Sequence, residues 1–550
     1  MKRILAVVLL LPAIIDAQSG ITFDRILKAR GEPHNWLTYS GDVMGQRYSP
    51  LTQVTPANVK NLELQWIFQA NSLEKFEATP LAVDGVLYTV QPPNDVVALD
   101  GATGRIFWTY SHVPSNQTRP CCGRVNRGVA ILGDSLFMAT LDGFVIALDA
   151  KSGRQQWKVK VEGARPEAGY AFTVAPLVVK DKVIVGPAGG DFGIRGWLAA
   201  YDALTGKEVW RFYTIPAPGE PGNTTWAGES WKTGGSAIWT TGTYDPETNL
   251  TFWGTGNPGP DWNGDGRMGD NLYADSVVAL DADTGKLKWH FQFTPHDEFD
   301  YDSTQVPVLA DIQLQGPSTA LGTSRTRKAM LFANRNGFWY VLDRTTGEYL
   351  SGKPFTRVTW TSGLDAKGRP MNQVSPTAAG TRVYPHLAGG TNWYSPSYSP
   401  RTGLLYVPAW MDTSANFIKG PAEYVEGRPF IGTFPNGSTL SIAGNAINRR
   451  LPEEGYGAII ALDPRTGERT WMFKMDDVTD AGVLSTASDL VFSGGREGFF
   501  FALDAKTGQP LWKANVGGFV QAGPMSYAIG QKQYIAIAAG HSLFTYALRP

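Results

Sequence analysis

Two cysteines stand side by side in this chain of 550 residues, and no others occur. Cys121 and Cys122 lie in the stretch RPCCGRVNRG. Neighbouring Cα atoms are about 3.8 Å apart, closer than most disulfides prefer, and a bond between neighbours closes almost no loop. If the pair is bonded, it is a poor staple and is better suited to form a rigid, flat, apolar surface. The alternative is two buried thiols without a chemical role.

Carboxylate and amide side chains occur in three separate phrases that could bind a hard cation. Asp191 lies in GGDFGIRG, Asn257 in GTGNPGP, and Asp300 and Asp302 in PHDEFDYD. Oxygen ligands of this kind suit Ca²⁺ or another hard cation. The sequence shows no Cys/His spacing typical of zinc and no His-Glu-x-x-His phrase. An acidic run is usually a solvated loop, so these residues alone leave a metal site and a surface loop open.

The elements that would position these residues are indicated by a repeated phrase. It runs apolar residues, Asp, two residues, Thr or Ser, Gly, three residues and Trp, as in VALDGATGRIFW. Each copy predicts a strand, a tight turn built on Asp and Gly, and a second strand. One copy, at 340–351, lacks the tryptophan, and a weaker unit, NLELQW, ends at Trp66. The other six copies end at Trp108, Trp157, Trp210, Trp289, Trp471 and Trp512.

Units of this size cannot bury both faces of a small sheet alone, so neighbouring units must stack. Seven clear copies and one weak copy predict an all-β fold, an eight-bladed β-propeller. A β-solenoid and a pair of β-sandwiches are the alternatives. The segment QYIAIAAG, residues 533–540, is predicted to be the last strand and to close the ring by pairing with N-terminal residues.

The N-terminal stretch MKRILAVVLLLPAIIDAQSG predicts a secretory signal peptide over residues 1–17. A buried N-terminal strand and a membrane anchor are the alternatives. The signal predicts export to the periplasm, with residues 18–550 as one propeller domain that has no membrane span. The formal net charge of −1, without a long run of like charge, argues against a nucleic-acid partner.

The repeated phrase resembles the tryptophan-docking motif of the alcohol dehydrogenases that depend on pyrroloquinoline quinone (PQQ), and the similarity covers nearly the whole chain. In that family an adjacent cysteine pair forms a disulfide against one face of the cofactor, which implies this role for Cys121 and Cys122. The resemblance assigns the opposite face of PQQ to Trp239, a PQQ carboxylate to Arg127 and the quinone oxygens to Arg335. It implies further cofactor contacts at Glu77, Thr173, Gly190, Asn392 and Trp393.

The same resemblance implies a metal site formed by Asp191, Asn257, Asp300 and Asp302. Two of these positions depart from the usual pattern of the family. Asp191 stands where the family usually has Glu, one methylene longer. Asp302 stands where calcium-dependent members have a small uncharged residue and lanthanide-dependent members have Asp. An extra carboxylate balances a trivalent ion better, so we expect one lanthanide ion, with Ca²⁺ as the alternative.

The resemblance also implies a reaction. Asp300 is expected to take the hydroxyl proton of a small primary alcohol as general base, while hydride passes to metal-bound PQQ and an aldehyde leaves. The sequence contains no Cys-x-x-Cys-His phrase for covalent haem, which predicts the single-domain type with a separate soluble cytochrome c or a similar electron acceptor. A homodimer is left open. The alternative function is a non-catalytic propeller scaffold of the cell envelope.

Overall fold

Strands carry almost all of the regular structure in the computed structural model, which describes residues 20–315, 324–436 and 454–549. The predicted signal peptide at 1–17 lies outside the described residues. In the described ranges the single α-helix is α1 (Phe23–Leu27), and no helix there is long and apolar enough to cross a membrane. The all-β prediction is confirmed.

Eight sheets of four or more strands are present in these ranges, and most are built from four strands consecutive in sequence. The first two such sheets contain β3 (Leu81–Val83), β4 (Val86–Gln91), β5 (Asp95–Asp100) and β6 (Ile106–Tyr110), and then β7 (Ala130–Leu132), β8 (Ser135–Ala139), β9 (Phe144–Asp149) and β10 (Gln155–Lys160). The third contains β11 (Leu177–Val179), β12 (Lys182–Val185), β13 (Trp197–Asp202) and β14 (Glu208–Tyr213). The fourth contains β15 (Thr243–Asp245), β16 (Leu250–Gly254), β17 (Ser276–Asp281) and β18 (Leu287–Gln292). The next three contain β19 (Val308–Gln315), β20 (Ser324–Ala333), β21 (Phe338–Asp343) and β22 (Tyr349–Pro354); β26 (Ser397–Ser399), β27 (Leu404–Met411), β30 (Tyr456–Leu462) and β31 (Arg469–Lys474); and β32 (Leu484–Thr486), β33 (Leu490–Gly494), β34 (Phe499–Asp504) and β35 (Pro510–Asn515), extended by β1 (Tyr48–Ser49).

The remaining large sheet joins the two ends of the described chain. It contains β36 (Met525–Ile529), β37 (Lys532–Ala539), β38 (Ser542–Leu548) and the N-terminal β2 (Leu62–Gln69), which pairs with β38. The ring is therefore closed by residues 542–548, and the prediction that 533–540 would be the last strand is wrong by one strand. The apolar run of β37 instead fills an interior position of the sheet, where both neighbouring strands satisfy its backbone.

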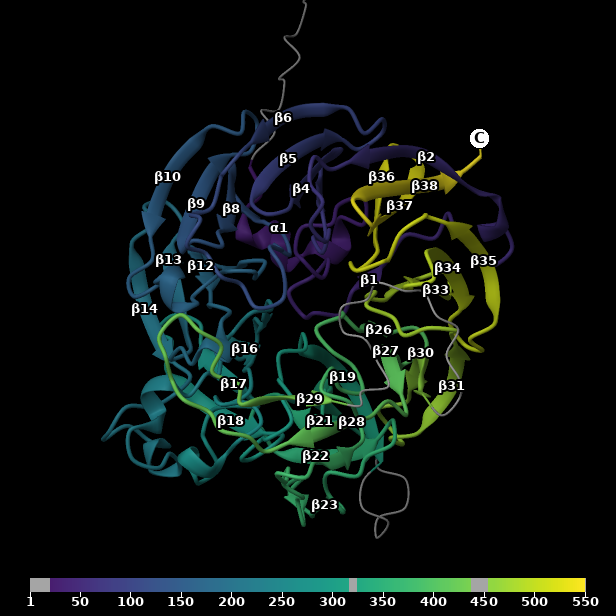
Figure 1. The fold of residues 1–550 in the computed structure, drawn as a ribbon. Coiled ribbons are helices and arrows are strands. Elements are labelled where there is room, and N and C mark those ends of the chain that lie inside the picture. The colour runs from purple at the N-terminus through teal and green to yellow at the C-terminus, as the bar shows by residue number, and fades with distance from the viewer. Residues whose placement is uncertain (1–19, 316–323, 437–453, 550) are drawn as a thin grey trace, which may run out of the picture.

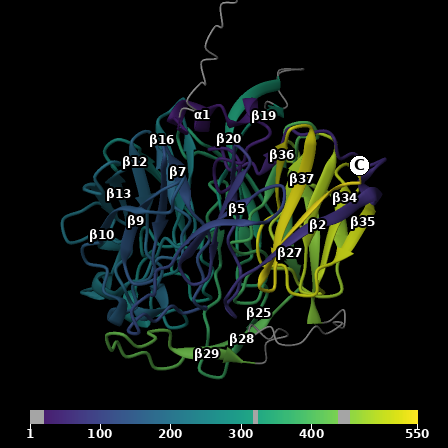
Figure 2. The same cartoon turned by 90° about the horizontal axis from the view of Figure 1, so that it is seen from above.

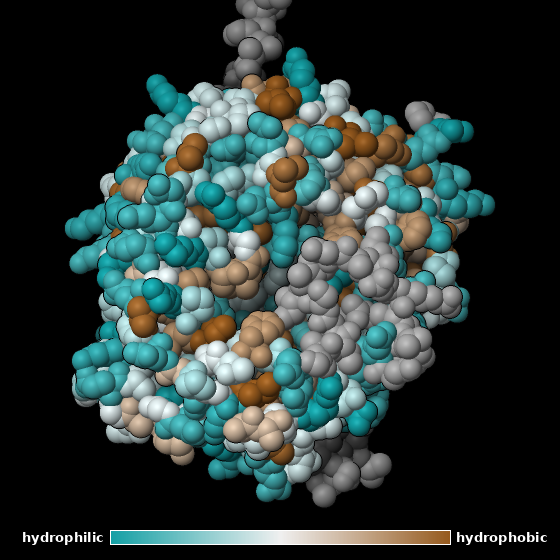
Figure 3. Space-filling view, in the orientation of Figure 1, coloured by the Kyte–Doolittle hydropathy of each residue, from teal (hydrophilic) through white to brown (hydrophobic). Residues whose placement is uncertain are grey.

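The sheets follow one another around a ring, with the tryptophan-bearing strands such as β10, β14 and β35 at the outside (Figure 1). Two small sheets lie apart from the ring of large sheets: β23 (Gly363–Leu364) with β24 (Pro370–Met371), and β25 (Thr381–Val383) with β28 (Ala415–Ile418) and β29 (Thr433–Asn436). Figure 2 shows α1 at one side of the ring and β25, β28 and β29 at the opposite side. On the face in Figure 3, polar and apolar side chains are mixed.

The repeated tryptophans connect one sheet to the next. The indole Nε1 of Trp108 donates to the Ala150 carbonyl oxygen at 3.1 Å, and that of Trp157 donates to Ala203 at 3.1 Å. The same ring of Trp108 lies against Gly153, where an added Cβ would come within 2.5 Å of ring carbon Cε3 and φ is +70°. Glycine in the repeated turn is thus required both for its backbone conformation and for the close approach of the neighbouring indole.

Candidate cofactor and metal site

One cavity of about 220 Å³ is lined by every residue that the sequence analysis assigned to the cofactor and the metal. Most of these residues lie in segments that lead into the first strand of successive sheets, so the ring directs them toward a common centre. Arg127 precedes β7, Thr173 precedes β11, and Trp239 precedes β15. The fourteen residues are Glu77, Cys121, Cys122, Arg127, Thr173, Gly190, Asp191, Trp239, Asn257, Asp300, Asp302, Arg335, Asn392 and Trp393.

Arg127 is the centre of the first charged group in this cavity. Its Nη2 lies 2.8 Å from Oε2 of Glu77, and its Nη1 donates to Oγ1 of Thr173 at 2.9 Å. The guanidinium carbon lies 5.0 Å from the ring centroid of Trp239 and 4.5 Å from that of Trp393. An arginine held between two indoles keeps its charge and presents a planar set of donors, which suits recognition of a carboxylate.

Arg335 is the centre of the second charged group. Its Nη2 lies 3.0 Å from Oδ2 of Asp300, and its Nη1 pairs with Asp302. The backbone N–H of Asn257 donates to Oδ1 of Asp302 at 2.9 Å. All four residues are less than a tenth exposed. Burial raises the pKa of Asp300 well above its ordinary value, and the Arg335 charge opposes that rise.

A constrained turn presents Asp300 to the cavity. The residue has φ of +62°, in the left-handed region that residues other than glycine seldom adopt. Asp297 holds the turn, because its carboxylate accepts the backbone N–H of Phe299 at 3.0 Å and that of Tyr301 at 2.7 Å. The sequence analysis did not assign a role to Asp297. Asp is nevertheless a common turn residue, because its side chain can accept the backbone N–H of the residue two positions later.

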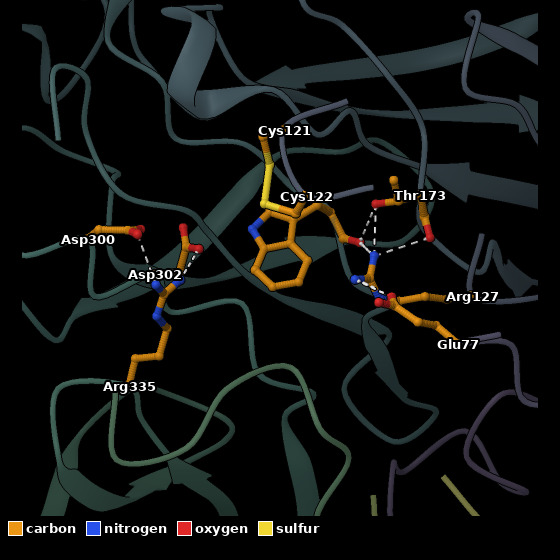
Figure 4. Close-up of a disulfide and its surroundings, with 9 residues drawn as sticks. Glu77, Cys121, Cys122, Arg127, Thr173, Asp300, Asp302 and Arg335 are labelled. Atoms are coloured by element: carbon orange, nitrogen blue, oxygen red, sulfur yellow. Dashed lines mark hydrogen bonds and ion pairs between the residues drawn. A yellow bond between two sulfur atoms is a disulfide. The ribbon is translucent and has the colours of Figure 1, made fainter. Parts of the chain in front are cut away.

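The cysteine pair is bonded, as the sequence analysis predicted, and it lies at the exposed mouth of the cavity. Figure 4 shows the disulfide between the two charged groups, with Asp300, Asp302 and Arg335 on one side and Glu77, Arg127 and Thr173 on the other. Because the Cα atoms are 3.8 Å apart, the bond links no distant parts of the chain. A flat apolar element between two charged groups matches a planar, multiply charged ligand.

The donors around Arg335 fit a hard cation. Three carboxylates, those of Asp191, Asp300 and Asp302, and the amide of Asn257 line the cavity together. Burial raises the pKa of Asp191, and the nearby Asp302 charge adds to the rise. Carboxylates that repel one another in a buried space are the oxygen-rich environment that a multivalent cation neutralises.

Three further charged residues of the same cavity were missed by the sequence analysis: Lys75 and the pair of Asp480 and Arg496. Asp480 and Arg496 both line it, and Arg496 Nε donates to Oδ2 of Asp480 at 2.8 Å. The hydroxyl of Tyr394 donates to Oδ1 of Asp480 at 2.8 Å. Asp480 and Arg496 lie more than three hundred positions after Cys121, and nothing in their local sequence marks them as cavity residues.

Comparison with known proteins gives alcohol dehydrogenases as relatives of this chain. Residues 36–359 match the family described as glucose/ethanol/alcohol dehydrogenase, beta-propeller domain, and residues 455–540 match the family of the outer membrane protein assembly factor BamB. The chain is 39% identical over 533 residues to the quinohemoprotein alcohol dehydrogenase ADH IIB of Pseudomonas putida, a match that covers 92% of this chain and 73% of the relative.

Two other similar proteins are described with cytochrome c or with europium in their names. The chain is 36% identical over 535 residues to a 1-butanol dehydrogenase (cytochrome c) of Thauera butanivorans, covering 92% of this chain and 74% of the relative. A solved structure described as a europium-containing methanol dehydrogenase superimposes with a TM-score of 0.86 at 33% identity, covering 96% of this chain and 100% of that one.

Proposed function

We propose, from the premise that this chain belongs to the PQQ-dependent alcohol dehydrogenases, that it oxidises primary alcohols to aldehydes and passes the electrons to a soluble cytochrome c. The chain is an enzyme of that family. The observation that carries the proposal is the single cavity that unites both charged groups, the disulfide and the carboxylates. We infer export to the periplasm from the predicted signal peptide and the bonded cysteines.

The finer architecture belongs to the same proposal. We infer that the eight sheets of four or more strands are the blades of an eight-bladed propeller formed by residues 18–550. The indole hydrogen bonds of Trp108 and Trp157 to the next sheet are what we expect of tryptophan docking. A homodimer stays a prediction.

The end of the cavity around Arg127 is suited to a carboxylate of PQQ. Arg127, Thr173 and Asn392 supply N–H and O–H donors there, and Glu77 holds the guanidinium in place by its ion pair. Trp393 and Trp239 flank Arg127 and limit its rotamers. The disulfide of Cys121 and Cys122 and the indole of Trp239 would exclude water from the two faces of the ligand, with Gly190 leaving space beside it.

At the other end, Asp300 is the proposed general base. It must be ionised to accept the hydroxyl proton, and burial works against ionisation. Arg335 lowers the pKa of Asp300 through its contact at 3.0 Å, and Asp297 holds the backbone turn that aims the carboxylate. When bound, PQQ would supply a hydride acceptor and the cation would supply a Lewis acid for the quinone oxygen.

The residues that would hold the cation are Asp191, Asn257, Asp300 and Asp302. We favour a lanthanide ion over Ca²⁺, because Asp302 adds a third carboxylate to those of Asp191 and Asp300, which line the same cavity as the amide of Asn257. The similarity to a europium-containing enzyme supports this choice. A trivalent ion gains more than a divalent ion from each additional carboxylate.

The test is dye-linked oxidation of ethanol by the purified protein, supplied with PQQ and either La³⁺ or Ca²⁺. The wild type is expected to turn over with La³⁺, and Asp300→Asn is expected to lose activity by about a thousandfold or more while it keeps its fold. Substantial residual activity of Asp300→Asn would reject Asp300 as the base. A protein that binds no PQQ and shows no turnover with either metal would leave the scaffold function, whose family shares the repeat at 455–540.

A further inference from the structure

Asp261 is a buried carboxylate for which the described part of the chain provides no hydrogen-bond partner. It follows Asn257 by four positions in GNPGPDW, is 1% exposed, and neither of its side-chain oxygens accepts a hydrogen bond. An ionised carboxylate in such a place is costly unless a cation or several donors compensate for it. None of the reaction steps derived above uses this residue.

The backbone around Asp261 is held on both sides. Gly259 N–H donates to the Gly234 carbonyl oxygen at 2.9 Å, and Trp262 N–H donates to that of Ile431 at 3.1 Å. Arg267 Nη2 donates to the Pro260 carbonyl oxygen at 3.0 Å. These bonds fix the backbone immediately before and after Asp261.

Asp261 belongs to a segment that packs against residues assigned to the cation and the cofactor. A Cβ added at Gly259 would lie 3.7 Å from the Gly190 carbonyl oxygen, and one added at Gly190 would lie 3.7 Å from Oδ1 of Asn257. The electrostatic neighbours of the Asp261 carboxylate, after burial itself, are Asp191 and Asp300, and the side chain of Asn257 is close enough to stabilise its charge. The side chain of Asp261 is in turn close enough to affect the pKa of Asp191. The arginine of the same segment, Arg267, is occupied elsewhere, since its Nη1 donates to Oδ1 of Asn271 at 2.8 Å and its Nη2 contacts backbone carbonyl oxygens.

We propose that Asp261 is a fourth carboxylate of the cation site and binds the ion through a side-chain oxygen beside Asp191 and Asn257. This inference rests on the proposed function, which places a cation in that cavity. Four carboxylates and the one guanidinium of Arg335 give the site a formal charge of −3, and without Asp261 the charge is −2. The site with Asp261 therefore balances the full charge of a trivalent cation, and its removal weakens the attraction for a trivalent ion more than for a divalent one.

The experiment compares Asp261→Asn with a matched control, Asp275→Asn. Among the described residues Asp275 is also fully buried with two unpartnered oxygens, but its charged neighbours are first Asp297 and then Asp302, and neither Asp191 nor Asn257 is among them. Metal bound at equilibrium is measured for the PQQ-loaded proteins by dialysis against chelator-buffered La³⁺ or Ca²⁺. Asp261→Asn is expected to weaken La³⁺ binding by at least about tenfold and Ca²⁺ binding by less, and Asp275→Asn is expected to change either by less than about threefold.

A second measurement does not require metal. Removing an uncompensated buried charge is expected to raise the thermal unfolding temperature of metal-free Asp261→Asn, and La³⁺ is expected to stabilise this variant less than the wild type. Wild-type La³⁺ affinity in Asp261→Asn, equal losses in both variants, or a lower unfolding temperature of metal-free Asp261→Asn would each overturn the inference while the proposed function stands. A wild type that binds neither cation would overturn the proposed function with it.

Discussion

Replacing Arg335 by Met is expected to destabilise the metal-free protein more than the metal-loaded protein. The guanidinium is 5% exposed and contacts both Asp300, at 3.0 Å, and Asp302. Met keeps much of the apolar volume of the side chain and removes its charge. Both carboxylates then lie buried without a cation, unless a metal ion replaces the arginine charge.

The magnitude follows from the burial of this pair. Breaking a buried ion pair by removing one partner costs about 3–5 kcal/mol. With an unfolding entropy of about 2.1 cal/mol/K per residue, that loss lowers the unfolding temperature of a chain this long by about 3–4 °C. A cation bound among the same carboxylates supplies the missing charge, so the difference from wild type is expected to fall to about 1 °C or less with La³⁺ and PQQ.

The same substitution has a second consequence for the pH profile. Arg335 lowers the pKa of Asp300 against the effect of burial, so its removal raises that pKa. Since the base works only when ionised, the acid limb of kcat/KM is expected to move to higher pH in Arg335→Met. The opposite direction, or an unmoved limb, would show that Arg335 does not set the ionisation of the base.

Calorimetry of both states and a pH profile of ethanol oxidation measure these effects, with Arg496→Met as the control. Arg496 is 6% exposed and pairs with Asp480 at 2.8 Å across the same cavity. Its replacement is expected to cost similar stability, but the loss should persist when metal is bound and the acid limb should stay in place. The reasoning fails if La³⁺ rescues both variants equally or rescues neither.

Three other predictions concern the metal, the acid stability and the disulfide. Asp302→Ala is expected to reduce activity with La³⁺ at least about tenfold more than activity with Ca²⁺, because it removes one carboxylate from the site; equal losses with both metals would contradict the lanthanide assignment. Although burial alone would raise the pKa of Asp142, hydrogen bonds that include one from His112 at 2.8 Å hold it at about 2. The Asp142 carboxylate therefore contributes about 2 kcal/mol of stability above pH ~4 that is lost as the pH falls toward about 2, and an Asp142→Asn variant that unfolds in acid like the wild type would refute this. Paired Cys121→Ser and Cys122→Ser changes are expected to lower activity at least about tenfold but to shift the unfolding temperature by less than about 2 °C, since the bond closes almost no loop; a larger shift would make it a structural staple.

Much of the architecture was predictable because its signals are local. The turn of each repeated phrase needs Asp and, four positions later, Gly, and the following strand usually brings a tryptophan to the same place. Packing of Trp108 on Gly153 then repeats from sheet to sheet. The order of the last strands was not predictable in this way, because β37 and β38 are both apolar and only pairing with β2 separates an interior strand from a closing one.

The candidate site, too, was predictable only where its signals lie in the local sequence. The sequence by itself determined a repeated all-β architecture, an adjacent cysteine pair and a set of acids and arginines whose resemblance to a known family assigned them to one cofactor. The folded chain was needed to show that Asp302 accepts the N–H of Asn257, that Arg335 contacts both Asp300 and Asp302, and that Asp261 is buried with no hydrogen-bond partner among the described residues. The physical reason is that turns and strands depend on neighbours in sequence, whereas the burial of a charge and the choice of its partner depend on segments that meet only when the ring closes.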